Sequence, residues 1–226
     1  MYNSVFEMRK IVYSLLNGLL ILVIMSILYA GLSSCTSMQH TTEEIKLVDD
    51  FSRRKYGWNT WVDEKGSAVN YFHGGLVFII NSAQHDYLST PIGIFSNTSI
   101  EVQAQRLVGP DDNDYGIVCR FQNEGNYYAF LYSSDGYYGI VKVKDHQYQM
   151  LNSSSMQFSP LILGKDNTNQ LRADCVGKIL SMYVNNQLIA QAVDEDFDSG
   201  KVGLIAGSFK SPGVAILFDN FVVSQQ

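Results

Sequence analysis

Charged side chains are scarce in this sequence, and basic ones are in the minority among them. Charged residues make up 17% and hydrophobic residues 46% of the 226 residues. This composition excludes an intrinsically disordered chain, because such chains are too poor in apolar side chains to bury a core. Lys and Arg number 16 against 22 Asp and Glu, which gives a net charge of −6. A surface without excess positive charge is unsuited to phosphates, so we expect no nucleic-acid partner.

The usual sequence marks of an enzyme are also missing. There is no Gly-x-Ser-x-Gly turn for a nucleophilic serine and no glycine-rich phosphate loop. The acids do not form the Glu-x-Asp-x-x-Glu pattern of laminarinase-like enzymes, nor a clear pair of carboxylates such as glycosidases use. The histidines show no metal-binding spacing: they are His40, His73, His85 and His146. We therefore predict no catalytic residue and no catalytic metal.

One acidic loop remains as a candidate for a cation. Asp111, Asp112 and Asp114 lie close together in the sequence, and carboxylate oxygens are the ligands that calcium prefers. Acidic loops are more often simply solvated. We therefore expect no cofactor, with a structural calcium ion in this loop as the alternative.

The N-terminal region predicts export. Arg9 and Lys10 precede an uncharged run over residues 11–32, as in a secretory signal. The run ends in Leu32-Ser33-Ser34-Cys35, which resembles the lipobox of bacterial lipoproteins, where the cysteine is lipidated and becomes the new N-terminus. This resemblance implies that Cys35 carries the lipid, palmitate included, and that the protein is tethered to a membrane.

The same run has a second interpretation. About 20 apolar residues suffice to span a bilayer, so residues 11–32 also fit an uncleaved transmembrane helix with Cys35 incidental. Under both interpretations the remainder lies outside the cytoplasmic membrane, at the bacterial cell envelope. We predict a signal peptide over residues 1–34, a tether over 35–44 and one domain over 45–226.

Proline is rare, with 4 residues, whereas the sequence has 18 Gly, 14 Tyr and 12 Phe. Glycines supply tight turns, and aromatic residues favour strands. After residue 45, short apolar runs recur between Gly, Asn and Asp clusters, and no long window has helical spacing. We predict an all-β domain, a two-sheet antiparallel jelly-roll sandwich. Its candidate strands cover residues 75–81, 98–107, 116–122, 127–133, 137–144, 170–176, 179–184, 188–193, 202–208 and 214–224.

Two predicted hairpins determine which side chains share a face. Asp135-Gly136 is a strong signal for a two-residue turn, which would pair Ser134 with Tyr137. A four-residue loop over 123–126 sets the register of the preceding strand. Both registers place the same apolar side chains on one face, predicted to be core: Ile117, Cys119, Phe121, Tyr128, Phe130, Tyr132, Val141 and Val143.

The opposite face of these strands is the candidate ligand site. It mixes aromatic and polar side chains, as expected of a sheet that contacts a ligand. Two tyrosines would stack on sugar rings and three polar side chains would bond hydroxyls: these residues are Arg120, Gln122, Tyr127, Tyr138 and Lys142. The alternative is that loops over 84–95 or 153–166 cover this face, with Arg120 in a salt bridge.

Cys119 and Cys175 are the cysteines of the predicted domain. Export places them in an oxidising setting where cysteines pair. Both lie on predicted strands with inward-facing neighbours. They form either a disulfide between two strands, which we favour, or two buried free thiols that pack as small apolar groups.

Short motifs in a fixed order carry a family resemblance: Asp49-Asp50-Phe51-Ser52, Tyr115-Gly116-Ile117-Val118, Asn126-Tyr127-Tyr128-Ala129-Phe130, Asn169-Gln170-Leu171-Arg172, Gly200-Lys201-Val202-Gly203-Leu204 and Phe218-Asp219-Asn220-Phe221. They resemble the concanavalin A-like lectin/glucanase superfamily, in the branch of laminin-G-like and 3-keto-disaccharide hydrolase-type domains. The resemblance spans residues 45–223 and implies two curved antiparallel sheets.

Proteins of this fold serve as lectins, enzymes and adhesion modules. Our leading hypothesis is a non-catalytic, lipid-anchored module that binds carbohydrate. A second hypothesis is a hydrolase of a glycoside or keto-sugar that uses loop acids such as Glu124 or Asp135. A third is an envelope scaffold or adhesion protein with protein partners.

Overall fold

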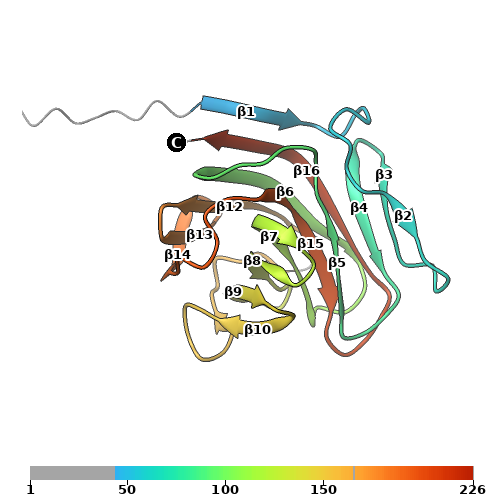
Figure 1. Cartoon of the computed structure of the whole chain (residues 1–226). Helices are drawn as coiled ribbons and strands as arrows, with labels where there is room; N and C mark the ends of the chain where they lie inside the picture. The colour runs from blue at the N-terminus through green and yellow to red at the C-terminus, as the bar shows by residue number, and fades with distance from the viewer. Residues whose placement is uncertain (1–43, 165, 226) are drawn as a thin grey trace, which may run out of the picture. The chain divides into compact units, whose positions relative to one another are not determined.

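Every regular element that the structure describes is a β-strand. The computed structural model describes residues 44–164 and 166–225 (Figure 1). None of these residues forms a helix that is long and apolar enough to cross a bilayer. The predicted signal segment, the lipidation site Cys35 and the predicted tether up to residue 43 lie outside the described residues.

The strands form two antiparallel sheets. The larger sheet runs in the order β14, β13, β12, β6, β16, β4, β3, β2, with β1 also paired to β16. Its strands are β1 (Glu44–Asp49), β2 (Trp61–Val62), β3 (Ala68–Phe72), β4 (Gly75–Ile80), β6 (Thr98–Val108), β12 (Thr168–Val176), β13 (Ile179–Val184), β14 (Gln187–Val193) and β16 (Val214–Gln225). In Figure 1, β12 to β14 lie on the left and β2 to β4 on the right.

The smaller sheet runs in the order β10, β9, β8, β7, β15, β5, with β11 also paired to β9. Its strands are β5 (His85–Ser89), β7 (Asn113–Asn123), β8 (Asn126–Tyr132), β9 (Tyr137–Lys144), β10 (Gln147–Met150), β11 (Gln157–Phe158) and β15 (Lys201–Ser208). Strands β10 and β5 are therefore at opposite ends of this strand order.

The main core lies between the two sheets. Ile117 and Phe130 of the smaller sheet and Val102 and Phe218 of the larger one are fully buried in one apolar cluster. The predicted two-sheet antiparallel sandwich is confirmed, and each of the ten candidate strands is present. The prediction missed shorter strands, among them β5 and β10.

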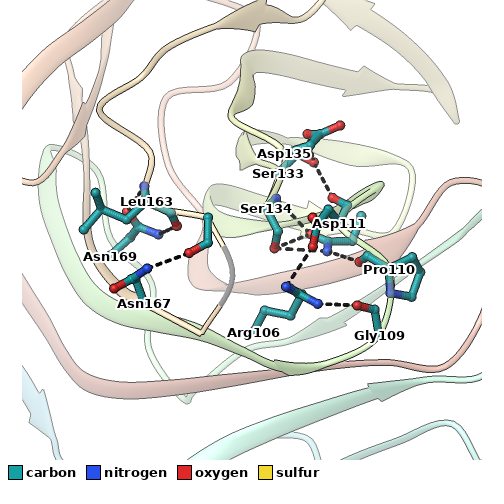
Figure 2. Close-up of polar contacts among 12 residues, drawn as sticks. Arg106, Gly109, Pro110, Asp111, Ser133, Ser134, Asp135, Leu163, Asn167 and Asn169 are labelled. Carbon is teal, nitrogen blue, oxygen red and sulfur yellow. Dashed lines mark hydrogen bonds and ion pairs between the residues drawn. The ribbon is translucent and has the colours of Figure 1, made fainter.

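The turn between β8 and β9 differs from the predicted one. The backbone N–H of Ser133 donates to the carbonyl oxygen of Tyr137 at 2.7 Å, so the turn contains three residues, 134–136. The side-chain oxygen of Asn113 accepts hydrogen bonds from the backbone N and the Oγ of Ser134 at 3.2 and 3.1 Å. Figure 2 shows Ser134 beside the connection that precedes β7. These contacts hold Ser134 out of the strand pairing.

A shift of one residue moves side chains to the other face of a sheet. Phe130 pairs with Ile140, and Val141 pairs with Ala129. The placement of Val141 and Val143 in the main core was therefore wrong, because both belong to a second apolar cluster. The predicted core positions Ile117, Cys119, Tyr128, Phe130 and Tyr132 are confirmed.

Strand β7 contains a bulge at Arg120. Its pairing with β8 is interrupted after Cys119 and resumes at Asn123, and Arg120 has a φ of 50°. This left-handed conformation is uncommon outside glycine, and a bulge redirects the side chains that follow it. Cys119 and Arg120 both point between the sheets. Phe121, which was expected in the main core, packs instead in the second cluster, where its ring centroid is 5.8 Å from that of Tyr127.

A disulfide between Cys119 and Cys175 joins β7 of the smaller sheet to β12 of the larger one. The S–S distance is 1.99 Å, and the two cysteines are 56 residues apart in the chain. The predicted disulfide is confirmed.

Reducing this disulfide should lower the free energy of unfolding by about 4 kcal/mol, because the unfolded chain regains the entropy of a long loop. Urea unfolding of oxidised and reduced protein measures the difference. The Cys119→Ala/Cys175→Ala double variant should show no effect of reductant. Equal midpoints for oxidised and reduced wild type would contradict the prediction.

Candidate functional site

Arg120, expected on the ligand face, is buried between the sheets with 2% of its surface exposed. Its guanidinium donates to the carbonyl oxygens of Phe197, Gly177 and Cys175 at 2.7, 2.8 and 3.3 Å. Burial lowers the pKa of Arg120. The side chain is engaged in holding the two sheets together and is not available to a ligand.

Lys142 and Tyr138 also point between the sheets. The Lys142 ammonium lies 2.6 Å from Asp194 and 2.7 Å from Asp196. Burial opposes the charged form of Lys142, but the hydrogen bonds with both carboxylates raise its pKa on balance. The Tyr138 hydroxyl donates to the carbonyl oxygen of Ile189 at 3.1 Å.

The expected grouping of five ligand residues on one face is therefore wrong. Arg120, Tyr138 and Lys142 are turned inward by the shifted turn and the bulge. Gln122 is exposed near the end of β7. Tyr127 alone of the five faces the second apolar cluster, and only 1% of its surface is exposed.

The outer face of the smaller sheet carries a groove whose floor includes Tyr127 and Val143 of the second apolar cluster, with Leu88 and Phe121 packed against that cluster. The other buried residues of the cluster do not line the groove: Val118, Ala129, Leu131, Val141 and Ile205, with Met150 and Met156 against them. The open space has a volume of about 1540 Å³. Met156 lies in the connection over residues 153–166 and packs on the second apolar cluster. This loop therefore covers part of the outer face, as the alternative interpretation expected.

A hydrogen bond across the groove shows that the smaller sheet is curved. The Tyr148 hydroxyl on β10 donates to Oδ2 of Asp86 on β5 at 2.9 Å. In a flat sheet five strand spacings would separate these strands by about 24 Å. The outer face is therefore concave.

Aromatic rings line this groove: Trp61, Tyr87, Phe121, Tyr127 and Tyr148. Tyr148 is 59% exposed, and its hydroxyl lies 3.4 Å from that of Tyr127 beneath it. Trp61 is half-buried and packs against Tyr87 with ring centroids 4.8 Å apart. Tyr148 therefore presents an anchored, accessible ring, as a stacking platform requires.

Two aspartates meet beside the Tyr148 hydroxyl. Asp86 on β5 and Asp114 on β7 both pair with Gly207 on the strand between them. A Cβ at position 207 would collide with Oδ1 of both aspartates, so glycine leaves the space that the carboxyls occupy. Burial and then the charge of Asp86 raise the pKa of Asp114 well above its ordinary value.

The acids proposed from the sequence are placed differently. Asp111 pairs with Arg106 at 2.7 Å (Figure 2), whereas Asp114 is buried with 2% of its surface exposed. Among residues 44–164 and 166–225 no group of three or more His, Cys, Asp or Glu is arranged to hold a metal ion. Glu124 and Asp135 lie in turns at opposite ends of β8, so they do not form a pair.

The sequence interpretation missed Asp86, Tyr148 and Trp61. All three lie on short strands that were assigned to loops or left unassigned. In β5 the alternation of Asp86 and Leu88 with Tyr87 is a weak sequence signal for a strand. No sequence signal predicts that Asp86 lies close to Asp114, because this proximity depends on the pairing of both strands with β15.

Comparison with known proteins gives the fold. No protein-family model matches the chain, and no curated protein matches it. The carbohydrate-binding module CBM66 from Bacillus subtilis is similar with a TM-score of 0.59 and 15% identity, over 74% of this chain and 95% of that one. The β-glucanase of Bacillus licheniformis gives a TM-score of 0.57 and 12% identity, over 82% and 99%.

A third structure is the GH43 protein BlXynB from Bacillus licheniformis, with a TM-score of 0.61 and 16% identity. The match covers 80% of this chain and 39% of that one, so this chain corresponds to part of the larger protein. These neighbours support the sandwich implied by the family resemblance, and at such identities they show the fold alone.

Replacing Asp114 with Asn should change how stability depends on pH. Because the native pKa of Asp114 is raised, the native state keeps a proton that the unfolded chain releases. Wild-type stability should therefore fall as pH rises through the interval between the unfolded pKa and the raised native one. Asp114→Asn lacks this loss, so its stability relative to wild type should increase with pH.

Urea unfolding between about pH 4, close to the ordinary aspartate pKa, and about pH 8 tests this. Asp112→Asn is the matched control, because that side chain is 38% exposed. Its unfolding free energy should run parallel to that of wild type. A constant offset between Asp114→Asn and wild type would contradict the assignment.

Proposed function

We propose that this protein binds carbohydrate in the concave groove of its smaller sheet. The observation that carries the proposal is the exposed Tyr148 ring, anchored through its hydroxyl to Asp86 above an apolar floor. Aromatic side chains in a concave site with a few convergent polar groups are typical of ligand pockets. The fold neighbours support the ligand class, because they include a carbohydrate-binding module and a glucanase.

The polar lining supports binding of a molecule rich in hydroxyls. Asn59, Gln84, Lys65 and Lys201 lie around the groove and offer amide and ammonium donors. Sugar rings have apolar faces that pack on aromatic side chains and hydroxyl rims that need such partners. A groove with both kinds of group suits a sugar better than a purely apolar ligand.

We favour binding over hydrolysis. Glycosidases place their two carboxyl groups roughly 5–5.5 Å or 6.5–9.5 Å apart, so that a sugar carbon or a water fits between them. The Oδ1 atoms of Asp86 and Asp114 lie 2.2 and 2.4 Å from the position that a Cβ at Gly207 would occupy, so they are at most 4.6 Å apart. This separation is shorter than either of the two glycosidase spacings.

We further propose that the protein is exported and lipid-anchored through Cys35, with an uncleaved N-terminal helix as the alternative. The support is the sequence alone: the basic flank, the uncharged run over 11–32 and the lipobox-like Leu32-Ser33-Ser34-Cys35. A tether would present the groove at the cell envelope.

Tyr148→Ala should weaken sugar binding by about tenfold, the effect of losing roughly 1.4 kcal/mol of ring contact. Affinity electrophoresis in gels containing xylan or β-glucan, and titration with chitin and chitosan oligosaccharides, measure binding. Trp61 fluorescence reports occupancy, since Trp58 is buried with its indole N–H bonded to Asp49 at 2.9 Å.

Tyr137→Ala is the matched control, because Tyr137 is 43% exposed but does not line the groove. It should leave binding unchanged. If Tyr148→Ala and wild type bind every one of these glycans equally, the groove is not the site. If wild type binds none of them, the proposed function itself fails.

Cys35→Ser should abolish lipidation of the full chain produced in a bacterial host. Detergent-phase partitioning and palmitate labelling follow the anchor, and the double variant at Cys119 and Cys175 is the control that should still be labelled. Two results together would favour the transmembrane helix. The Cys35→Ser protein would keep the size of wild type and still enter the detergent phase, and wild type would not be labelled with palmitate.

A further inference from the structure

Asp86 and Asp114 form a carboxyl pair in the wall of the groove, hereafter the aspartate pair. Asp86 lines the groove, and Asp114 lies behind it with 2% of its surface exposed. The bare Gly207 between their strands lets the two Oδ1 atoms converge. The pair is thus a built feature of three adjacent strands.

The converging oxygens lack a donor from the protein. Oδ1 of Asp114 is buried and has no hydrogen-bond partner among the described residues. Oδ2 of Asp86 already accepts the Tyr148 hydroxyl. Two carboxyls whose oxygens converge in this way do not both ionise readily, and burial followed by the charge of Asp86 raises the pKa of Asp114, so Asp114 holds the proton. The pair then carries one negative charge and one exchangeable proton.

The surroundings favour a positive ligand. No basic side chain is among the groups that shift the pKa of Asp114. Burial, and after it the charges of Asp86, Asp114 and Glu124, raises the pKa of the Tyr127 phenol. The other ionisable side chains that line the groove are Asp63, Glu64, Lys65, His85, Tyr87, His146, Lys201 and Lys210. Aromatic rings beside a carboxylate suit a cation.

We propose that the aspartate pair is a subsite for the primary ammonium of an amino sugar; this rests on the proposed function and names its ligand class. The ammonium donates to Oδ1 of Asp86 beside the Tyr148 ring and takes the place of the Asp114 proton, which leaves to solvent. Asp86 contacts the ligand, and Asp114 is a positioning residue that holds the exchangeable proton.

A divalent cation fits the pair less well. Calcium takes six to eight oxygen ligands, and the described residues provide no cluster of three acidic or other metal-binding side chains. An ammonium needs only a few acceptors, which the pair and the adjacent phenol supply. The amine is therefore the occupant that this geometry favours.

The test compares glucosamine oligosaccharides with fully N-acetylated ones of the same length, by titration calorimetry at several pH values. Wild type should bind the amine form at least about tenfold more tightly, because acetylation removes the charged donor. Since binding releases the Asp114 proton, affinity for the amine should rise by up to about tenfold per pH unit while Asp114 is protonated in the unliganded protein. Repeating the titration in buffers of different ionisation enthalpy counts the released proton.

Three variants separate the roles. Asp86→Asn should lose the preference for the amine while keeping affinity for the N-acetylated form. Asp114→Asn removes the exchangeable proton, so it should keep the preference and lose the pH dependence. Asp112→Asn, which removes an acidic side chain outside the groove lining, should change neither. Near-ultraviolet circular dichroism of each unliganded variant verifies that it is folded.

If wild type binds the amine and the N-acetylated oligosaccharide with equal affinity, as Asp86→Asn is expected to do, the inference is overturned. The proposed function would still stand in that case. Loss of the preference in Asp112→Asn as well would overturn it too, since general negative charge would then explain the result. Calcium ions that bind wild type but not Asp86→Asn, and that displace the amine, would assign the pair to a metal instead. Binding of none of these sugars, xylan or β-glucan would reject the proposed function.

Discussion

The architecture depends on the buried guanidinium of Arg120. It stays charged under all ordinary conditions, so the carbonyl oxygens that satisfy it, from Phe197, Cys175 and Gly177, must remain in place. Cys119 must also point inward to reach Cys175. Two consecutive inward side chains require the bulge in β7, and the bulge turns Phe121 outward onto the floor of the groove. One buried cation thereby links the cohesion of the two sheets to the surface proposed to bind sugar.

The sequence was enough to predict the sandwich, ten strands and the disulfide, because long strands with apolar alternation and paired inward cysteines are local signals. It was not enough for the register of β8 and β9. Asp135-Gly136 favours a two-residue turn, but Asn113, some twenty residues earlier, bonds Ser134 and lengthens the turn by one residue. A contact between distant segments therefore overruled a local rule, and every side chain of β9 changed face.

The candidate site could be predicted only in its outline. An aromatic ligand face on the smaller sheet was expected, yet only Tyr127 of its five predicted residues faces the groove. The side chains now assigned to the site come from β5 and β10, which are short, polar and at the ends of the strand order. Their proximity arises from curvature, and the space for the aspartate pair arises from the missing side chain of Gly207. Neither property is visible in residue types taken along the chain.

The pairing of β1 with β16 has a mechanical consequence. Glu44, where the described chain begins, lies opposite Gln225, and the ladder continues to Asp49 opposite Phe221. A pull on Glu44 along the strand direction, away from Asp49, loads these hydrogen bonds together in shear instead of opening them one at a time. If the domain is held at this end, a force on a bound polymer acts on all the hydrogen bonds between β1 and β16 at the same time.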